Sequence, residues 1–107
     1  MSYELTDEQK LVCAMAVGAY GPRAQWAKMA EELRELAAEV DAYLAGQVDW
    51  DALNSERADV AVMLFQFDSL LFPKQGDFVR LEIGRKVERL ACRLWENFMN
   101  KNKENES

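Results

Sequence analysis

The chain has 107 residues, 50% of them hydrophobic and 30% charged, a composition that predicts one folded domain and excludes a disordered chain. Its 13 Lys and Arg against 19 Asp and Glu give a formal net charge of −6, which argues against a protein that coats duplex nucleic acid. The absence of His removes the usual general base and the usual zinc ligand.

Three further features bear on the cellular setting. Two cysteines, Cys13 and Cys92, are too few to staple a small secreted domain and are expected to be reduced thiols. The first ten residues, MSYELTDEQK, lack the basic region and apolar stretch of a signal peptide. The longest apolar run, Val60 to Phe65, is far shorter than a membrane span. The sequence therefore predicts a soluble, cytoplasmic domain with no membrane partner.

The first two predicted helices are separated by a Gly-Pro pair. Thr6 and Gln9 form the pattern of a capping box, which begins a helix that runs to about Gly18. Pro22 suits the first turn of a second helix, because the N–H that proline lacks has no partner at that position. Apolar residues then recur every three or four positions until Gly46, which ends this helix.

Two more helices are predicted after Gly46. Asp49 caps the third, which Pro73 and Gly76 bring to an end, and Asp77 caps the fourth. The apolar positions of the fourth helix, expected on its buried side, are Phe78, Leu81, Val87, Leu90, Ala91, Leu94 and Phe98. The polar stretch 101–107 is expected to fray.

These elements predict an all-α fold, a four-helix bundle formed by residues 1–100 as a single domain. The second and third helices are joined by a few residues and are expected to form an antiparallel central hairpin. Several large aromatic residues are too many for one small subunit to bury: Trp50, Phe65, Phe67, Phe72 and Trp95. We therefore expect a homo-oligomer, either a homodimer or a dimer of dimers.

Acidic residues fall on particular faces of the second and third helices. Glu32 and Glu35 share one stripe of the second helix, at about 100° per residue. On the third helix Glu56 and Asp59 are three residues apart, and Glu56 lies only about 40° from Val60, the centre of the apolar face. An isolated buried carboxylate costs roughly several kcal/mol, unless it takes up a proton or binds a cation.

Folding the hairpin about residue 47 brings these acids together. Glu35 is then level with Asp59, and Glu32 and Glu56 lie within about one to two turns of that level. Oxygen ligands without His or Cys select hard ions, so the expected cofactor is Mg²⁺, with Mn²⁺ as the alternative. One such acidic pair by itself is more often a solvent-exposed helix face, whereas two pairs on facing helices favour a metal site.

The order of these acids resembles the signature of the MazG-like all-α nucleoside triphosphate pyrophosphohydrolases, especially their short single-domain members. The signature residues are Glu31-Glu32-x-x-Glu35 and, after a gap of twenty residues, Glu56-x-x-Asp59. Neighbouring segments resemble the family over roughly residues 20 to 95, namely YGPRAQWAKMAEELREL, ERADVAVMLFQF and GRKVERLACRL.

The resemblance implies a fold, a reaction and a metal site. Members of this family hydrolyse a nucleoside triphosphate at the α–β linkage and release the monophosphate and pyrophosphate with the help of Mg²⁺. By resemblance, Glu32, Glu35, Glu56 and Asp59 are the metal ligands and the catalytic residues. Glu31 completes the paired glutamates of the signature without an assigned ligand role.

The resemblance also implies contacts with the substrate. Lys86 and Arg89 match positions that contact the phosphates. Gln25 lies in the stretch that relatives use near the base, and the adjacent Trp26 is expected to be a core residue. Gly84 stands where some relatives carry an Asn that contacts the nucleotide, so this contact is not expected here.

The sequence leaves two other classes of function open. One is a non-catalytic helical adaptor, whose acids serve solubility and the choice of partner. The other is a nucleotide-binding regulatory module, which keeps the metal without turning the nucleotide over. If the chain is an enzyme, its expected role is to remove non-standard or surplus nucleotides.

Overall fold

The computed structural model describes residues 4–106, which form helices joined by short connections and include no strand. The elements are α1 (Asp7–Leu44), α2 (Trp50–Phe65), a π-helix η1 (Gln66–Leu71) and α3 (Pro73–Glu106). The prediction of an all-α fold is therefore confirmed. Across the same residues, no helix offers a stretch both long enough and apolar enough to span a lipid bilayer.

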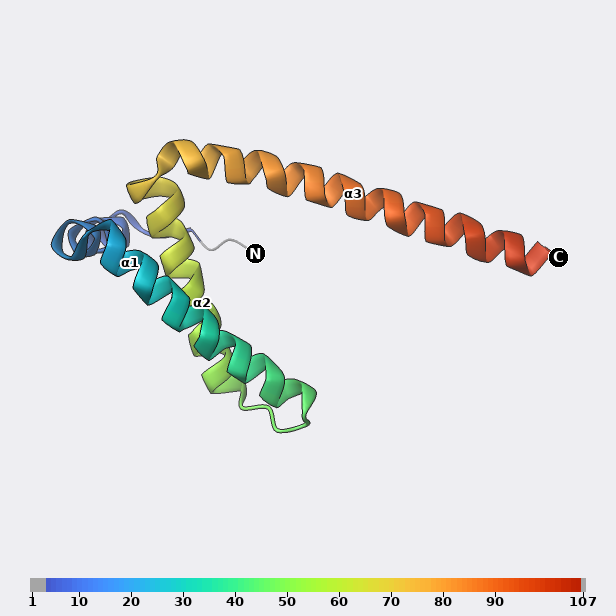
Figure 1. Cartoon of the computed structure of the whole chain (residues 1–107), viewed down its shortest axis with the longest axis horizontal. Coiled ribbons are helices and arrows are strands. Elements are labelled where there is room, and N and C mark those ends of the chain that lie inside the picture. Colours follow the sequence, from blue (N-terminus) through green and yellow to red (C-terminus); the bar gives the residue numbers. More distant parts are fainter. Residues whose placement is uncertain (1–3, 107) are drawn as a thin grey trace. The chain divides into compact units, whose positions relative to one another are not determined.

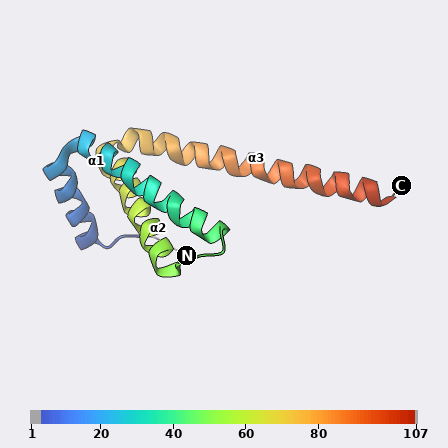
Figure 2. The same ribbon diagram turned by 60° about the horizontal axis from the view of Figure 1, so that its bottom comes forward.

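Helix α1 consists of two parts, because the backbone leaves helical geometry at Gly21 (Figures 1 and 2). Gly21 has φ 79° and ψ 170°, a region that only glycine adopts readily, and Pro22 has no N–H for the preceding turn. At the start of the first part, Oγ1 of Thr6 accepts from the Gln9 amide at 3.1 Å, and Oε1 of Gln9 accepts from the Thr6 amide at 2.8 Å. The predicted capping box and the predicted break are both confirmed.

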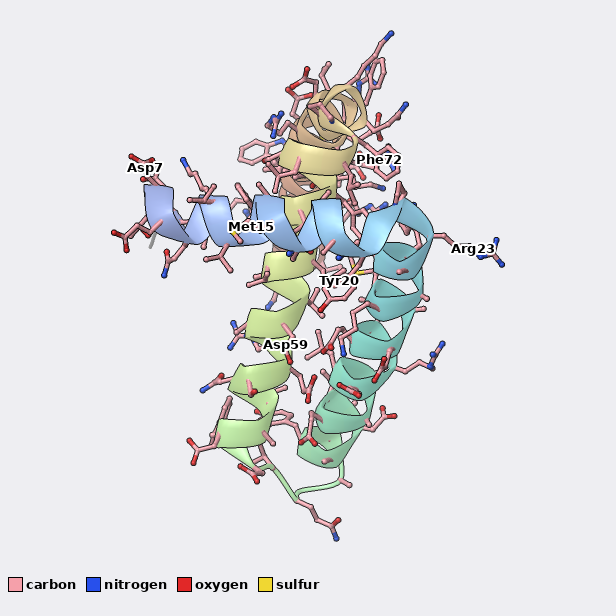
Figure 3. The ribbon with its side chains drawn as sticks, turned by 90° about the vertical axis from the view of Figure 1, so that its left-hand side faces the viewer. Asp7, Met15, Tyr20, Arg23, Asp59 and Phe72 are labelled. Carbon is pink, nitrogen blue, oxygen red and sulfur yellow. The ribbon has the colours of Figure 1, made fainter. Side chains whose placement is uncertain are left out.

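The second part of α1 and α2 form an antiparallel hairpin (Figures 1 and 3). The chain turns at Ala45 and Gly46, and Gly46 has φ 76°. Asp49 then caps α2, because its Oδ1 accepts from the Ala52 amide at 3.1 Å. The predicted hairpin and the predicted cap are therefore present.

The first part of α1 lies across α2 rather than along it, as the positions of Asp7, Met15 and Tyr20 in Figure 3 show. Cys13, from this part, is buried and is a free thiol. It lines a shallow pocket together with Val62 of α2. Cys13 therefore acts as an apolar packing residue, in agreement with the expected reduced state.

The core lies where α1 meets the end of α2 and η1. Met29, Met63 and Phe67 are buried together. Trp26 stacks on Phe67 with ring centroids 4.1 Å apart, and Phe72 lies 6.2 Å from Phe67. Aromatic pairs of this kind contribute about 0.5–1.5 kcal/mol each beyond their burial. Trp26 therefore belongs to the core on one face of its indole, although 54% of the residue is exposed.

The start of α3 differs from the prediction, because the helix begins at Pro73 and not after Asp77. Proline is favourable at the first helical position, and Asp77 instead lies one turn inside the helix, where it pairs with Arg80 at 2.6 Å. The helix also continues through 101–106, part of the stretch expected to fray, since no Pro or Gly interrupts it there.

By its packing the chain divides into two units, Met1–Pro73 and Lys74–Ser107. The second unit consists of α3 after its first residue. Taken by itself, this helix exposes all the apolar positions that the sequence predicts to be buried, which are Phe78, Leu81, Val87, Leu90, Ala91, Leu94 and Phe98. The stripe is suited to packing against another apolar surface.

Replacing Gly21 by alanine tests the break in α1. We expect Gly21→Ala to lower the free energy of unfolding by about 1–3 kcal/mol, because a Cβ strains the backbone at this φ and ψ. Urea denaturation measures the change. The matched control is Gly18→Ala, which places a methyl group in open space on a regular helix and should stabilise the chain by about 0.5–1 kcal/mol. If the Gly21→Ala chain were as stable as the wild type, the non-helical backbone assigned to Gly21 would be wrong.

Candidate functional site

Three of the four predicted metal ligands come together between α1 and α2. One carboxylate oxygen from each of Glu32, Glu35 and Glu56 lies within 4.8 Å of the others, and we call these three residues the carboxylate cluster. Glu32 and Glu35 are one turn apart on α1, and Glu56 comes from α2. Oxygen ligands on opposite sides of one Mg²⁺ or Ca²⁺ ion are about 4–5 Å apart. The spacing therefore suits a single hard cation.

In two carboxylates of the cluster, one oxygen lacks a hydrogen-bond partner. Glu32 is only 4% exposed and Glu56 is half-buried. Within the described part of the chain, neither Oε2 of Glu32 nor Oε2 of Glu56 has a partner. An ionised carboxylate oxygen only accepts hydrogen bonds, so neighbouring carboxylates satisfy it only through a proton or a cation. This shortage distinguishes the cluster from an acidic helix face in water.

Asp59, the fourth predicted ligand, lies next to the cluster on α2 (Figure 3). Burial and the charge of Glu32 raise the pKa of Asp59. Asp59 therefore faces Glu32, and Glu56 faces Glu35. The sequence analysis placed Glu35 level with Asp59, whereas the strongest electrostatic partner of Asp59 is Glu32 and that of Glu56 is Glu35.

Lys28 pairs with the most buried member of the cluster, a contact that the sequence analysis missed. Its Nζ lies 2.9 Å from Oε1 of Glu32 and 3.7 Å from Oε2 of Glu31. This contact holds the pKa of Glu32 below its usual value, although burial acts in the opposite direction. Glu32 and Glu31 in turn raise the pKa of Lys28. The only sequence signal is the spacing of four residues, which is common on exposed helices.

Glu56 has the most strongly shifted pKa of the cluster. Burial, followed by the charges of Glu35, Asp59 and Glu32, raises the pKa of Glu56 to about 7. Glu56 therefore keeps its proton to a higher pH than an ordinary glutamate. A divalent cation would favour the ionised carboxylate, so metal and proton compete at this residue.

The predicted substrate contacts are divided between the two units. Gln25 is 5% exposed and lies about two turns before Glu32 on the buried side of α1. Gln66 of η1, which the sequence analysis did not single out, is 6% exposed, and its Oε1 has no hydrogen-bond partner among residues 4–106. Lys86 and Arg89 lie one turn apart on α3 and are exposed on that unit.

Comparison with family models, with curated proteins and with solved structures finds no match to this chain. The geometry of the cluster and the resemblance described above are the two observations that point to a function. Both observations concern the same three residues. Glu32, Glu35 and Glu56 belong to the acidic signature and also lie together in space.

The raised pKa of Glu56 predicts how stability depends on pH without metal. The folded chain keeps this proton up to about pH 7, whereas an ordinary glutamate loses it near 4.5. Between these values the folded state binds more protons than the unfolded state, so stability falls as pH rises. We expect Glu56→Gln to have a higher melting temperature than the wild type at pH 8, with the difference shrinking towards pH 5. Thermal unfolding in EDTA measures it.

The control for this measurement is Asp41→Asn, which removes an exposed carboxylate from the same helix as Glu32 and outside the cluster. Its melting temperature should follow that of the wild type across the same pH range. A Glu56→Gln difference that is equal at pH 5 and pH 8 would contradict the assignment of the proton to Glu56.

Proposed function

We propose that the chain is a Mg²⁺-dependent nucleoside triphosphate pyrophosphohydrolase, with Mn²⁺ as the alternative ion. It cleaves a ribo- or deoxyribonucleoside triphosphate into the monophosphate and pyrophosphate, and clears non-standard or surplus nucleotides in the cytoplasm. The observation that carries this proposal is the carboxylate cluster, with unpartnered oxygens on Glu32 and Glu56. The resemblance to the MazG-like enzymes supports the choice of reaction.

The donor set fits the proposed ion, because Glu32, Glu35, Glu56 and Asp59 offer only carboxylate oxygens. When bound, Mg²⁺ supplies charge neutralisation at the phosphates and a lower pKa for the attacking water. The four carboxylates would hold the ion between α1 and α2, and one of them would accept a proton from the attacking water. Hydrolysis of a phosphoanhydride needs no covalent step from the protein, so a site without His is sufficient.

Three further residues are proposed to hold the substrate. Lys86 and Arg89 bind phosphate oxygens and offset the negative charge that the ion leaves uncovered. Gln25 offers an amide for the edge of the base, since an amide carries both donors and an acceptor. The burial of Gln25, on the same side of α1 as Glu32, supports its place near the site.

The assembly proposed for this function is a four-helix bundle that forms a homodimer or a dimer of dimers. The support is the amount of exposed apolar surface. The apolar stripe of α3 is exposed on its unit. The first unit exposes large apolar residues as well, which include Leu11, Val12, Met15, Leu33, Val40, Trp50 and Leu64. A single chain in water rarely keeps so much apolar surface uncovered.

The same exposed apolar surface favours a second candidate function, a non-catalytic helical adaptor that binds a partner through α3. Such an adaptor would release no pyrophosphate and gain no stability from Mg²⁺. A nucleotide-binding regulatory module would bind Mg²⁺ and a triphosphate but leave the triphosphate intact. These three functions therefore differ in two measurable properties, metal-dependent stabilisation and pyrophosphate release.

Pyrophosphate release is the test of the proposed reaction. We expect release from at least one compound in a screen of ribo-, deoxyribo- and modified triphosphates, and only when Mg²⁺ is present. Glu56→Gln and Asp59→Asn should each lower turnover by more than about 100-fold, since even the loss of an outer-shell partner costs about 10–100-fold. Circular dichroism should show that both variants remain folded.

Asp41→Asn is again the control, and it should keep the wild-type rate. A Glu56→Gln or Asp59→Asn chain with a near-wild-type rate would remove that residue from the set of ligands. If no triphosphate releases pyrophosphate under any condition, the proposed reaction is wrong.

The proposed assembly gives a prediction of its own. Light scattering at micromolar concentration should report a dimer or a larger oligomer, because the apolar stripe of α3 requires cover. A fully active monomer of 12.3 kDa would contradict it. Mixing Glu56→Gln chains with Lys86→Ala chains, which should bind the triphosphate weakly, tests whether two chains share one pocket. Recovered activity means that they do, and no recovery means that each chain builds its own.

A further inference from the structure

The carboxylate cluster already has one positive charge beside it, the ammonium of Lys28. Nζ of Lys28 lies 2.9 Å from Oε1 of Glu32. The Glu32 side chain is only 6% exposed, whereas the Lys28 side chain is 52% exposed. The ammonium therefore approaches the buried carboxylate from the solvent side and neutralises one of the charges that a metal would neutralise.

Lys28 and a divalent cation compete for Glu32. A metal held by Glu32, Glu35 and Glu56 would place its charge within a few ångströms of the ammonium. Repulsion between two cations at about 5 Å is large enough to change an affinity about tenfold. Because Lys28 is a flexible and half-exposed side chain, it has room to move away when the metal binds.

We propose that Lys28 is an exchangeable counter-ion of the carboxylate cluster, which neutralises Glu32 in the metal-free chain, yields this carboxylate to the divalent cation and then binds a phosphate oxygen of the triphosphate. This inference rests on the proposed function. Lys28 thus neutralises Glu32 before the metal binds and contacts the substrate afterwards.

The second half of the exchange follows from the reach of the side chain. The released ammonium would remain one turn before Glu32, and the length of the lysine side chain would let it reach a phosphate oxygen of a triphosphate held at the cluster. Glu31, with its Oε2 at 3.7 Å from Nζ, keeps the lysine on this side of α1. An ammonium beside phosphate oxygens forms a charge-assisted hydrogen bond, so the exchange replaces one anionic partner by another.

The test uses the full chain and two readouts that should move in opposite directions. Binding of Mn²⁺ without nucleotide is measured by the electron paramagnetic resonance signal of the free ion. We expect Lys28→Gln to bind Mn²⁺ about tenfold more tightly than the wild type, because the competitor is gone. With the triphosphate that the wild type hydrolyses, the same variant should have a KM about tenfold higher, with a smaller change in kcat.

The matched control is Lys10→Gln, which removes the same charge from an exposed position on the same helix. It should change neither readout. A lysine that only stabilised α1 would leave Mn²⁺ affinity unchanged or weaken it, so tighter binding in Lys28→Gln distinguishes the exchange from a structural role.

The outcomes separate this inference from the proposed function. If the wild type binds no Mn²⁺, the proposed metal site is wrong and the exchange is wrong with it. If the wild type binds Mn²⁺ and Lys28→Gln binds it no more tightly, the site stands and the exchange is overturned. An unchanged KM overturns the phosphate contact. Should Lys28→Gln fail to fold, lysine side-chain NMR of the wild type decides, because the Lys28 ammonium signal must move when Mg²⁺ is added.

Discussion

Closing the hairpin of α1 and α2 brings the carboxylates of Glu32, Glu35 and Glu56 together and removes Glu32 almost wholly, and Glu56 partly, from solvent. Both the repulsion among their charges and the loss of hydration oppose the packing of the two helices. The opposing contribution comes from the adjacent apolar core, in which Met29 precedes Glu32 by one turn and Phe67 stacks on Trp26. Packing of the core therefore keeps the two helices close together against the repulsion among the carboxylates. The ionisation of the site and its contact with Lys28 both follow from this opposition.

Two features of the chain relieve the repulsion among the carboxylates. The pKa of Glu56 is raised to about 7, which favours its neutral form, and Glu32 has the ammonium of Lys28 as its counter-ion. The proton and the ammonium each bring one positive charge to a cluster of several carboxylates. One oxygen of Glu32 and one of Glu56 still lack a hydrogen-bond partner. A divalent cation would replace both and bring more charge to the same place. A cluster that costs stability in the empty state is typical of a binding site and not of a scaffold, since functional groups are commonly kept at the expense of stability.

The sequence predicts those parts of the site that depend on the period of a single helix, and it does not predict those that depend on how two helices pack. Helical periodicity alone places Glu56 beside the apolar face of α2, and the structure finds it half-buried. Which acids of the two helices face each other depends on the connection at residues 45–49, whose backbone the helical periodicity does not determine. Lys28 was missed for another reason, since its spacing from Glu32 is unremarkable until tertiary packing buries the glutamate. Two sequence signals mark a possible start of α3, a proline suited to the first turn at Pro73 and a capping residue at Asp77. The helix begins at Pro73.

Positive and negative charges are distributed unequally between the first unit and α3. Most of the acids lie in the first unit, and most of the Lys and Arg residues lie on α3. On that helix Arg80 and Arg85 pair with acids three residues before them, whereas within residues 4–106 no ion pair involves Lys86 or Arg89. In the proposed bundle, the apolar stripe of α3 would cover exposed apolar residues of a first unit, and its cations would offset part of that unit's negative charge. The triphosphate of the proposed reaction carries more negative charge than one divalent ion neutralises, which is the physical reason for proposing Lys86 and Arg89 as its further partners.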